Sequence, residues 1–445
     1  MTTTSSDDEA RSPTRRDLAS LAVLVIATVA VYYRVIDFDL IYAWDDGLYV
    51  LHRPEVKDWF AVSWRKRLLT PELGYPVALP TFLYYLVHRL SGDAIAPAVH
   101  SLNLVFHLGA TTLAYLLARR WTDRWSAFAA TLLWAVHPLV VESVAWATNL
   151  KMVMLGAFAF GGMLAWEKQC EKPSRMMQVV ALGCVLAALA CRPGGAVLPL
   201  VYLAQSMRAH SLSIARNPSH AWPIWIGVLV AIAYAPLAVF GHDEILAATR
   251  PDLTLANHLG RIGSALTIQL THAVQPFELH PAYYPHEVVG GLHSVVGFGL
   301  ALVLIVLTAV AWRRTHAALP GLLVFWAFYL PTSGISVLPR FTADTYMYLP
   351  LFGLCIAGVA TAHQLLSAVR AKLRGAIVVA FGIVVVSLAL VSHGQSLRWQ
   401  NGVTLWEPVI EAYPTQAQPY WIVGETYASR GDHQRALETF LAGED

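Results

Sequence analysis

Charged residues are scarce in this sequence. They make up 13% of its 445 residues, whereas a typical soluble domain carries about 25%. The 31 basic and 29 acidic residues nearly cancel to a formal charge of +2, which argues against electrostatic binding of nucleic acid. Hydrophobic residues account for 56%, and the mean hydropathy is +0.50. This composition indicates an all-α polytopic membrane protein, in which the 15 Trp and 18 Tyr favour the level of the lipid headgroups.

Several common motifs are also absent. The sequence has no phosphate-binding loop of the GxxxxGK[ST] type, no CxxC pair and no HExxH zinc motif. It has four cysteines, of which Cys184, Cys191 and Cys355 fall in or beside apolar runs and Cys170 in a short charged loop. No two of them form an obvious pair in one external loop. We therefore expect no disulfide framework, and cysteines that act as small apolar side chains.

About eleven apolar segments are candidates to cross a bilayer, although several are short. A hydrocarbon core about 30 Å thick needs roughly 17–25 residues of helix. We interpret the first segment as an uncleaved anchor behind a cytoplasmic tail of residues 1–17, since no A-x-A cleavage motif precedes Tyr32. The segments are 18–38, 96–118, 125–144, 152–166, 177–190, 196–207, 222–240, 292–312, 319–335, 346–365 and 376–392.

Basic loops predict the orientation of these segments, because Lys and Arg near membrane spans stay in the cytoplasm. The five basic loops share one side only if residues 192–195 make an external turn. Residues 259–273 must also return without crossing, as a re-entrant or interfacial helix. The basic residues are Arg119, Arg120 and Arg124; Lys168, Lys172 and Arg175; Arg208 and Arg216; Arg313 and Arg314; and Arg370, Lys372 and Arg374.

With the cytoplasmic tail 1–17, this predicted orientation divides the chain into three parts. The transmembrane domain spans 18–394, with an external loop at 39–95 and an external region at 242–291. The tail, 399–445, is polar, helical and also external, and its sequence matches the tetratricopeptide (TPR) pattern. A single repeat must lean on the membrane domain, pair with another chain or belong to a longer array. The matching positions are Tyr420, Val423, Gly424, Tyr427, Gly431, Ala436 and Phe440.

The first external loop contains a predicted amphipathic helix at residues 56–68. Its aromatic and aliphatic residues share one face, while most of the basic residues lie on the others. This pattern favours a helix lying on the membrane surface. An aromatic packing helix beneath the loop is a compatible alternative.

Two adjacent aspartates, Asp45 and Asp46, follow the first apolar segment. The ordinary explanation is helix capping or solvation at the interface. The functional explanation is a general base held where a lipid-linked substrate could reach it. Because consecutive side chains point in different directions, at most one of the two is expected to face a given site.

His100, Asn103 and His107 line one face of the second segment, since they are spaced by three and four residues. Polar groups inside a membrane usually face the bundle interior, where interhelical hydrogen bonding is the default role. Two histidines without a carboxylate at ligand spacing are a weak metal signal. We expect no cofactor, although a divalent metal stays open.

Three cations reach the external ends of neighbouring segments: Lys151, Arg192 and Arg340. His137 and Pro138 close the third segment, and the proline is expected to kink it there. Each cation alone could be a snorkelling residue. External Lys and Arg at span ends are nevertheless exceptional, and three of them beside a carboxylate pair suggest an anionic ligand, most simply a phosphate.

The motifs, in order, are Asp45-Asp46; His100-x-x-Asn103-x-x-x-His107; His137-Pro138-x-x-x-Glu142-Ser143-Val144-Ala145-Trp146; Arg192-Pro193; Thr342-Ala343-Asp344-x-Tyr346-x-Tyr348-Leu349-Pro350; and the closing TPR. Together they resemble the transmembrane-and-TPR-containing O-mannosyltransferases of the endoplasmic reticulum and their bacterial relatives. The resemblance covers nearly the whole chain, and the combined order is more specific than any single motif.

The resemblance implies a C-type glycosyltransferase (GT-C) fold in a membrane, for the bacterial relatives the inner membrane. It implies inverting transfer of a sugar, mannose-like, from a polyprenyl-phosphate donor to an acceptor hydroxyl of a protein or glycan. It makes Asp45, with its neighbour Asp46, the catalytic carboxylate, and Lys151, Arg192 and Arg340 ligands of the donor phosphate. The polar groups expected at the substrate site are His100, Asn103, His107, His137, Glu142, Asp344, Tyr346 and Tyr348.

Two other hypotheses remain. Thr345 stands where the bacterial relatives usually have arginine, and the single TPR is far shorter than the family's arrays. A transporter or flippase of lipid-linked intermediates would explain the intramembrane polar residues, but the sequence has no internal repeat between its halves. A non-catalytic scaffold acting through the tail would explain the altered motifs, but not the retained acidic pair and external cations.

Overall fold

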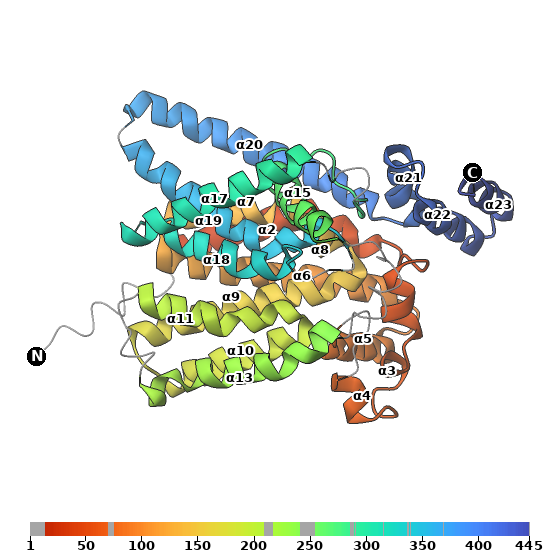
Figure 1. Cartoon of the computed structure of the whole chain (residues 1–445), viewed down its shortest axis with the longest axis horizontal. Helices are drawn as coiled ribbons and strands as arrows, with labels where there is room; N and C mark the ends of the chain where they lie inside the picture. The colour runs from red at the N-terminus through yellow and green to blue at the C-terminus, as the bar shows by residue number, and fades with distance from the viewer. Residues whose placement is uncertain are drawn as a thin grey trace, which may run out of the picture.

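The described residues fold into helices without a β-strand (Figure 1). The computed structural model describes residues 14–69, 75–208, 217–240, 254–284, 289, 291–314, 316–335, 338, 340–367 and 369–444. Most of the predicted tail 1–17 and parts of the region 242–291 lie outside these ranges. The α-helices are α2 (Arg15–Tyr32), α3 (Pro54–Lys57), α4 (Trp64–Leu69), α5 (Ala78–Ser91), α6 (Ile95–Trp121), α7 (Arg124–Ala135), α8 (Val141–Ala145), α9 (Leu150–Glu171), α10 (Arg175–Cys191), α11 (Leu198–Arg208), α13 (Pro218–Phe240), α15 (Leu255–Val274), α17 (Gly291–Arg313), α18 (Leu319–Tyr329), α19 (Tyr348–Ser367), α20 (Ala371–Arg398), α21 (Gly402–Ala412), α22 (Ala417–Ser429) and α23 (His433–Ala442).

Seven helices within the described ranges are long and apolar enough to cross a membrane, or eight if the bent pair α7 and α8 counts as one span. This confirms the all-α polytopic class. A helix lies at each of the eleven predicted segments, but α10, α11 and α18 are too short to pass the same test, so the number eleven is not confirmed. All four cysteines are free thiols.

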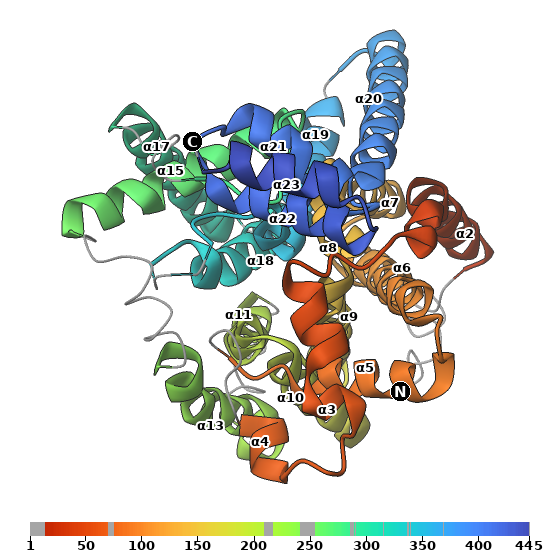
Figure 2. The ribbon, with the colours of Figure 1, turned by 90° about the vertical axis from the view of Figure 1, so that its right-hand side faces the viewer.

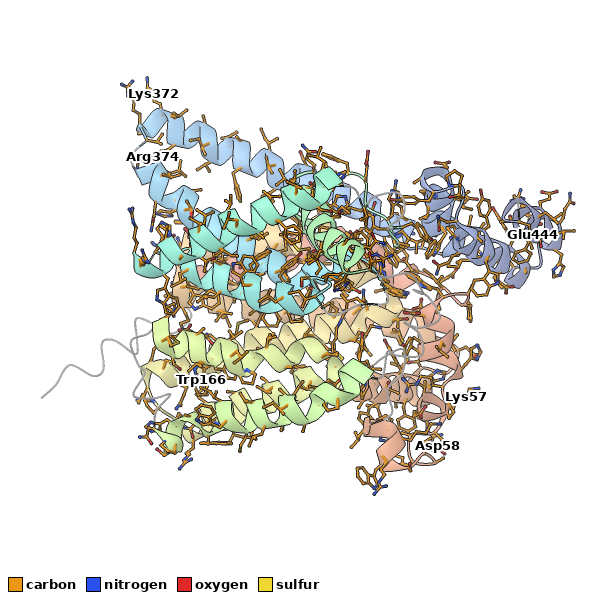
Figure 3. The ribbon with its side chains drawn as sticks, viewed as in Figure 1. Lys57, Asp58, Trp166, Lys372, Arg374 and Glu444 are labelled. Carbon is orange, nitrogen blue, oxygen red and sulfur yellow. The ribbon has the colours of Figure 1, made fainter. Side chains whose placement is uncertain are left out.

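The basic-loop pattern predicts that residues 370–374 lie on the opposite side of a membrane from the first loop and the tail, and these segments do lie at opposite ends of the bundle. Lys372 and Arg374 lie at one end, whereas Lys57, Asp58 and Glu444 lie at the opposite end (Figure 3). Figures 1 and 2 both show the tail helices α21–α23 at the same end as α3–α5. The first loop and the tail therefore share one end of the molecule, and its orientation across a membrane stays a prediction.

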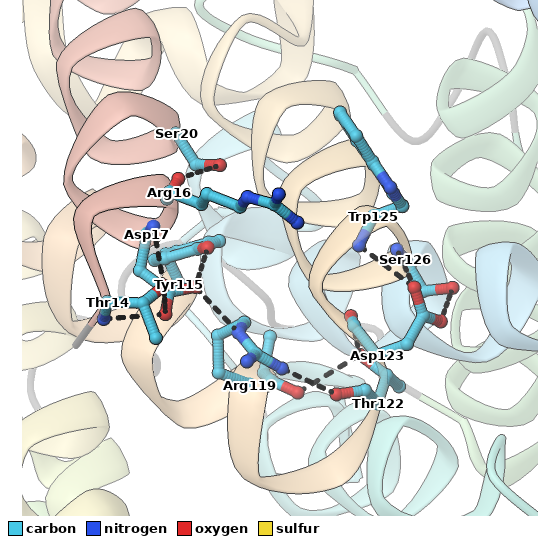
Figure 4. A network of polar contacts seen from close by, with 11 residues as sticks. Thr14, Arg16, Asp17, Ser20, Tyr115, Arg119, Thr122, Asp123, Trp125 and Ser126 are labelled. Atoms are coloured by element: carbon cyan, nitrogen blue, oxygen red, sulfur yellow. Dashed lines mark hydrogen bonds and ion pairs between the residues drawn. The ribbon is translucent and has the colours of Figure 1, made fainter. Parts of the chain in front are cut away.

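A polar network joins the start of α2 to the last turns of α6 (Figure 4). The Asp17 carboxylate accepts hydrogen bonds from the Tyr115 hydroxyl at 2.7 Å and from Arg119 Nε at 2.9 Å. Thr14 and Asp17 also form a capping box at the start of α2. These bonds set the register of α2, and so the point at which its loop leaves the bundle.

The third predicted segment is kinked where the sequence has Pro138. Helices α7 and α8 are bent by 60° around the 3-10 turn η3 (Pro138–Val140). His137 Nδ1 accepts the Leu139 N–H at 3.2 Å and so caps that turn, while His137 Nε2 lies 3.2 Å from the Ala273 carbonyl of α15. The kink turns the end of this segment, with Glu142, back into the bundle rather than onward along its axis.

Helices α15 and α17 cross at very close range. A Cβ atom added to Gly297 would lie 1.9 Å from the carbonyl oxygen of Gly263. Thr267 Oγ1 donates to the His293 carbonyl at 2.7 Å across the same contact. Helix α15 is not among the candidate spans of the described residues. Its interfacial or re-entrant placement stays a prediction, but its docking against α17 is clear.

Gly297→Ala is expected to destabilise the protein by about 1–3 kcal/mol, because the new methyl group overpacks this crossing. Gly299→Ala, in the same helix, is the matched control, since a Cβ there meets nothing within 4 Å. The control should be neutral or slightly stabilising, as Ala favours a helix over Gly. Thermal unfolding in detergent compares the two variants. Equal unfolding temperatures would contradict the close crossing.

The single amphipathic helix predicted at residues 56–68 is wrong. The chain forms α3 and α4 instead, because the Asp58 carboxylate accepts the N–H groups of Phe60 and Ala61 and turns the backbone between them. Val56 is buried, whereas Phe60, Trp64 and Leu68 are exposed. The exposed aromatic and basic surface of α4 still suits a membrane surface, a role that stays a prediction.

The tail forms three helices, of which α22 and α23 pack as a hairpin. Gly424 faces the Phe440 ring so closely that a Cβ would lie 2.4 Å from it, and Ala436 is buried. This is the small-to-aromatic packing that a TPR pattern predicts, although its identity as a TPR remains an interpretation. The tail also contacts the membrane domain directly, as described below.

Candidate active site

The two aspartates after α2 have different environments. Asp46 is fully buried, and its carboxylate accepts the N–H groups of Ile41 at 2.9 Å and Thr148 at 3.0 Å, together with the Thr148 hydroxyl. Burial raises the pKa of Asp46 to about 6, while these hydrogen bonds lower it and the neighbouring Asp45 raises it. Asp46 therefore fixes the loop to the 3-10 turn η4 (Ala147–Asn149).

Asp45 is partly exposed and faces cations instead. Burial raises the pKa of its carboxyl above the ordinary value, and the charges of Lys151 and Arg340 oppose that rise. A carboxylate that is partly accessible, held by its neighbour and close to the charges of two cations is suited to accept a proton. Of the predicted pair, Asp45 is thus the better candidate base and Asp46 its anchor.

Lys151 and Arg192 are cations without a carboxylate partner: neither forms an ion pair within the described part of the chain. Lys151 is buried at the start of α9, with Nζ 5.0 Å from the centre of the Tyr49 ring. Arg192 follows α10, and its guanidinium lies 5.4 Å from the centre of the Tyr346 ring. Aromatic faces hold both cations and leave their charge available to an anion.

Arg340 is engaged differently from the other two cations. It forms an ion pair with Glu142 and donates to the Pro281 carbonyl. The second Glu142 oxygen accepts the Thr345 N–H at 2.9 Å, and the Thr345 and Ser143 hydroxyls lie 2.9 Å apart. Glu142 and Arg340 thus join α8 to the loop before α19. Arg340 therefore differs from Lys151 and Arg192 in that its charge is paired with a carboxylate, and its part in binding phosphate stays a prediction.

Asp344 and Tyr346 lie in the 3-10 turn η7 (Asp344–Met347). The Tyr283 hydroxyl donates to Asp344 Oδ1 at 2.7 Å, and His272 Nδ1 lies 3.9 Å from the same oxygen. Asp344 therefore ties η7 to the segment after α15. Tyr346, by contrast, presents its ring to Arg192 and belongs to the cation cluster.

The remaining predicted polar residues hold helices together. Asn103 Nδ2 donates to the Trp146 carbonyl at 2.8 Å, which links α6 to the turn before Lys151. His107 Nδ1 and the Tyr348 hydroxyl are 2.8 Å apart, both buried among aromatic rings. His100 is buried against Phe38. His137 has the capping role described above, and the place of these residues at the substrate site stays a prediction.

Three aromatic residues near these charges are not among the predicted site residues, although Trp146 stands in a quoted motif. Tyr75 lies near both free cations: burial raises the pKa of its phenol, but the charges of Arg192 and Lys151 outweigh that and bring it below its usual value. Trp44 and Trp146 stack with ring centres 4.2 Å apart. The sequence signal for Trp44 was its position directly before Asp45. Tyr75 belongs to no recognisable motif. The described residues contain no group of three His, Cys, Asp or Glu side chains able to hold a metal.

No protein-family profile matches the chain. A protein O-mannosyl-transferase of Caenorhabditis elegans is 23% identical over an alignment of 461 positions that covers 96% of this chain. The predicted resemblance to the O-mannosyltransferases is confirmed. The match covers 63% of that O-mannosyl-transferase, so this chain spans less than two thirds of its relative's length.

Solved structures give further likenesses. The apo oligosaccharyltransferase of Archaeoglobus fulgidus matches with a TM-score of 0.49 and 13% identity, over 85% of this chain and 56% of that one. AglB from the same organism, in complex with an inhibitory peptide and a dolichol-phosphate, matches with a TM-score of 0.48 and 13% identity, over 85% and 55%. Arabinosyltransferase EmbB from Mycobacterium smegmatis matches with a TM-score of 0.37 and 15% identity, over 97% and 44%.

Proposed function

We propose that this chain is a membrane glycosyltransferase of the GT-C type. It transfers a mannose-like sugar from a polyprenyl-phosphate donor to an acceptor hydroxyl, a Ser or Thr of a protein, with inversion. One observation carries the proposal: the charge of Lys151 acts on the partly exposed carboxylate of Asp45, and the charges of Lys151, Arg192 and Asp45 all act on the phenol of Tyr75. The similarity to an O-mannosyl-transferase over nearly the whole chain supports it.

The reaction needs one base and one anion site. The acceptor oxygen attacks the anomeric carbon while its proton passes to the Asp45 carboxylate. The bond between that carbon and the phosphate oxygen breaks, and the electron pair leaves with the polyprenyl phosphate. Lys151 and Arg192 stabilise the departing phosphate, an effect worth several kcal/mol in comparable sites. Attack opposite to the leaving phosphate inverts the anomeric configuration.

An apolar groove between α11 and α18 suits the polyprenyl chain of the donor. Its volume is about 210 Å³. Helix α11 begins just after the 3-10 turn η5 (Pro193–Val197), which follows Arg192. In this proposal the lipid chain of a phosphate bound at Arg192 runs along α11, whose residues line the groove. The residues that line it are Trp121, Leu200, Val201, Ala204, Gln205, Arg208, Pro320, Leu323, Val324, Trp326, Ala327 and Leu330.

Transfer in detergent or nanodiscs tests the proposal. The purified full chain is incubated with radiolabelled polyprenyl-phosphate mannose, other polyprenyl-phosphate sugars and a Ser/Thr-containing acceptor peptide. Labelled peptide is the expected result with at least one donor. No transfer with any donor, by protein that is folded and monodisperse, would instead favour the transporter or scaffold hypotheses.

The site is proposed to face the external, in bacteria the periplasmic, side of the inner membrane, because the basic loops predict that parity. Reporter fusions after Ser206, Thr315 and Asp445 are expected to give inside, inside and outside signals. Each fusion keeps all preceding segments, so the signals count crossings independently of activity. A cytoplasmic signal at Asp445 would overturn both the external tail and the non-crossing assignment of residues 259–273.

A further inference from the structure

Four tryptophans form one cluster between the aspartate loop and the C-terminal tail. Trp44 stacks on Trp146 with ring centres 4.2 Å apart and planes at 10°. Trp406 of α21 meets Trp44 edge-on at 5.0 Å, and Trp399, which follows α20, lies 5.9 Å from Trp146. Trp146, Trp399 and Trp406 are buried. Aromatic pairs in this geometry stabilise a contact beyond their buried area.

Polar contacts tie the tail to the same loop. The Asp39 N–H donates to the Gln400 carbonyl at 3.0 Å, and Arg430, which directly follows α22, forms an ion pair with Asp39 at 2.9 Å. Tyr413, which directly follows α21, packs on Tyr284 with ring centres 5.2 Å apart. The tail is therefore docked on two external segments and not merely tethered to α20.

The cluster also contacts the charged groups around Asp45. Arg340 lies over both the Trp44 and the Trp146 rings, 5.7 Å from each centre. Lys151 Nζ lies 5.8 Å from the centre of the Trp146 ring. A displacement of Trp44 would thus move Asp45, its chain neighbour, relative to both cations that act on its charge.

We propose that the tail is a positioning element of the transfer site: Trp406 and Trp399 hold Trp44 in its stack on Trp146 and so fix the carboxylate of Asp45. This inference rests on the proposed function. Neither tail residue touches the reacting atoms in this mechanism. Their effect is on the geometry of the base, where a misplacement of about 1 Å can cost on the order of 100-fold in rate.

The test uses the full chain in nanodiscs and three substitutions. Trp406→Ala removes the edge-on contact, Trp406→Phe keeps a ring, and Trp421→Ala is the matched control, because Trp421 lies in the same tail but is 50% exposed. We expect Trp406→Ala to lower kcat on the order of 10-fold to 100-fold while binding of polyprenyl-phosphate mannose is unchanged. Trp406→Phe should recover most of the rate, and Trp421→Ala should match wild type.

Hydrogen–deuterium exchange of residues 39–50 is a readout independent of sugar transfer. Trp406→Ala should exchange faster in this loop, and Trp421→Ala should not. Equal exchange in both variants, or equal turnover in both while Asp45→Asn is inactive, overturns the positioning role and leaves the proposed function intact. If wild type transfers no sugar, the proposed function fails, and the exchange comparison still decides whether Trp406 holds the loop. Should Trp406→Ala not fold, Trp406→Leu replaces it.

Discussion

Asp45→Asn is expected to lose about 10²–10⁴-fold in transfer rate while it folds and binds donor like wild type, because the amide keeps the size of the side chain but cannot accept the proton. Asp46→Asn should lose much less. The Asp46 carboxylate accepts hydrogen bonds from Ile41 and Thr148, and an amide oxygen can accept part of that set. Single-turnover transfer with polyprenyl-phosphate mannose measures both rates.

The comparison of the two variants separates base from anchor. If Asp46→Asn is the inactive variant, the roles are exchanged but the mechanism survives; near wild-type rates for both would refute it. The pH profile of wild type adds a second check. Burial raises the pKa of Asp45 above its ordinary value, so the rate should fall as the pH drops through that raised pKa, where the carboxylate takes up a proton.

Weakened donor binding is the second large effect, expected for Lys151→Gln and Arg192→Gln. A hydrogen bond to a charged group contributes about 1.5–3 kcal/mol, so each substitution should raise the Kd for polyprenyl-phosphate mannose about 10-fold to 150-fold. The structure makes these two cations better candidates than Arg340, which is paired with Glu142.

Competition binding with labelled donor measures the loss, and Lys168→Gln is the control. Lys168 carries the same charge in the last turn of α9, whereas Lys151 lies in its first turn. The control should bind donor like wild type. If Lys151→Gln and Arg192→Gln both match the control, the phosphate is bound elsewhere, and the two cations serve only to lower the pKa of nearby groups.

Local patterns predicted the parts of the fold that depend on local physics. Hydropathy located the helices, since burial in lipid requires a continuous apolar run. Pro138 predicted the 60° kink, because proline lacks the N–H that continues a helix. The helix predicted at residues 56–68 failed for a local reason too: its apolar spacing continues across Asp58, whose side chain turns the backbone. The spacing of apolar residues does not reveal that the Asp58 side chain competes with helix formation for backbone N–H groups.

The candidate site was predictable only in part. Residue type and the positive-inside rule singled out the pair Asp45 and Asp46 and the cations Lys151, Arg192 and Arg340, and the resemblance to the O-mannosyltransferases then favoured Asp45. The pairing of Arg340 with Glu142, nearly 200 residues apart in the chain, depends on how η7 docks on α8. The same holds for the His107–Tyr348 bond, which makes two apparent site residues part of the packed interior. Contacts between distant segments leave no periodicity in the sequence.

The tryptophan cluster has a consequence for the order of synthesis. Trp44 and Asp45 leave the ribosome first, whereas Trp399 and Trp406 follow more than 350 residues later. A nascent chain that has already inserted Asp45, Lys151 and Arg192 therefore lacks the two rings that brace Trp44. Under the positioning role proposed above, the base is not yet held in place during translation and membrane insertion, and full activity is reached only once residue 406 has been translated and the tail has docked.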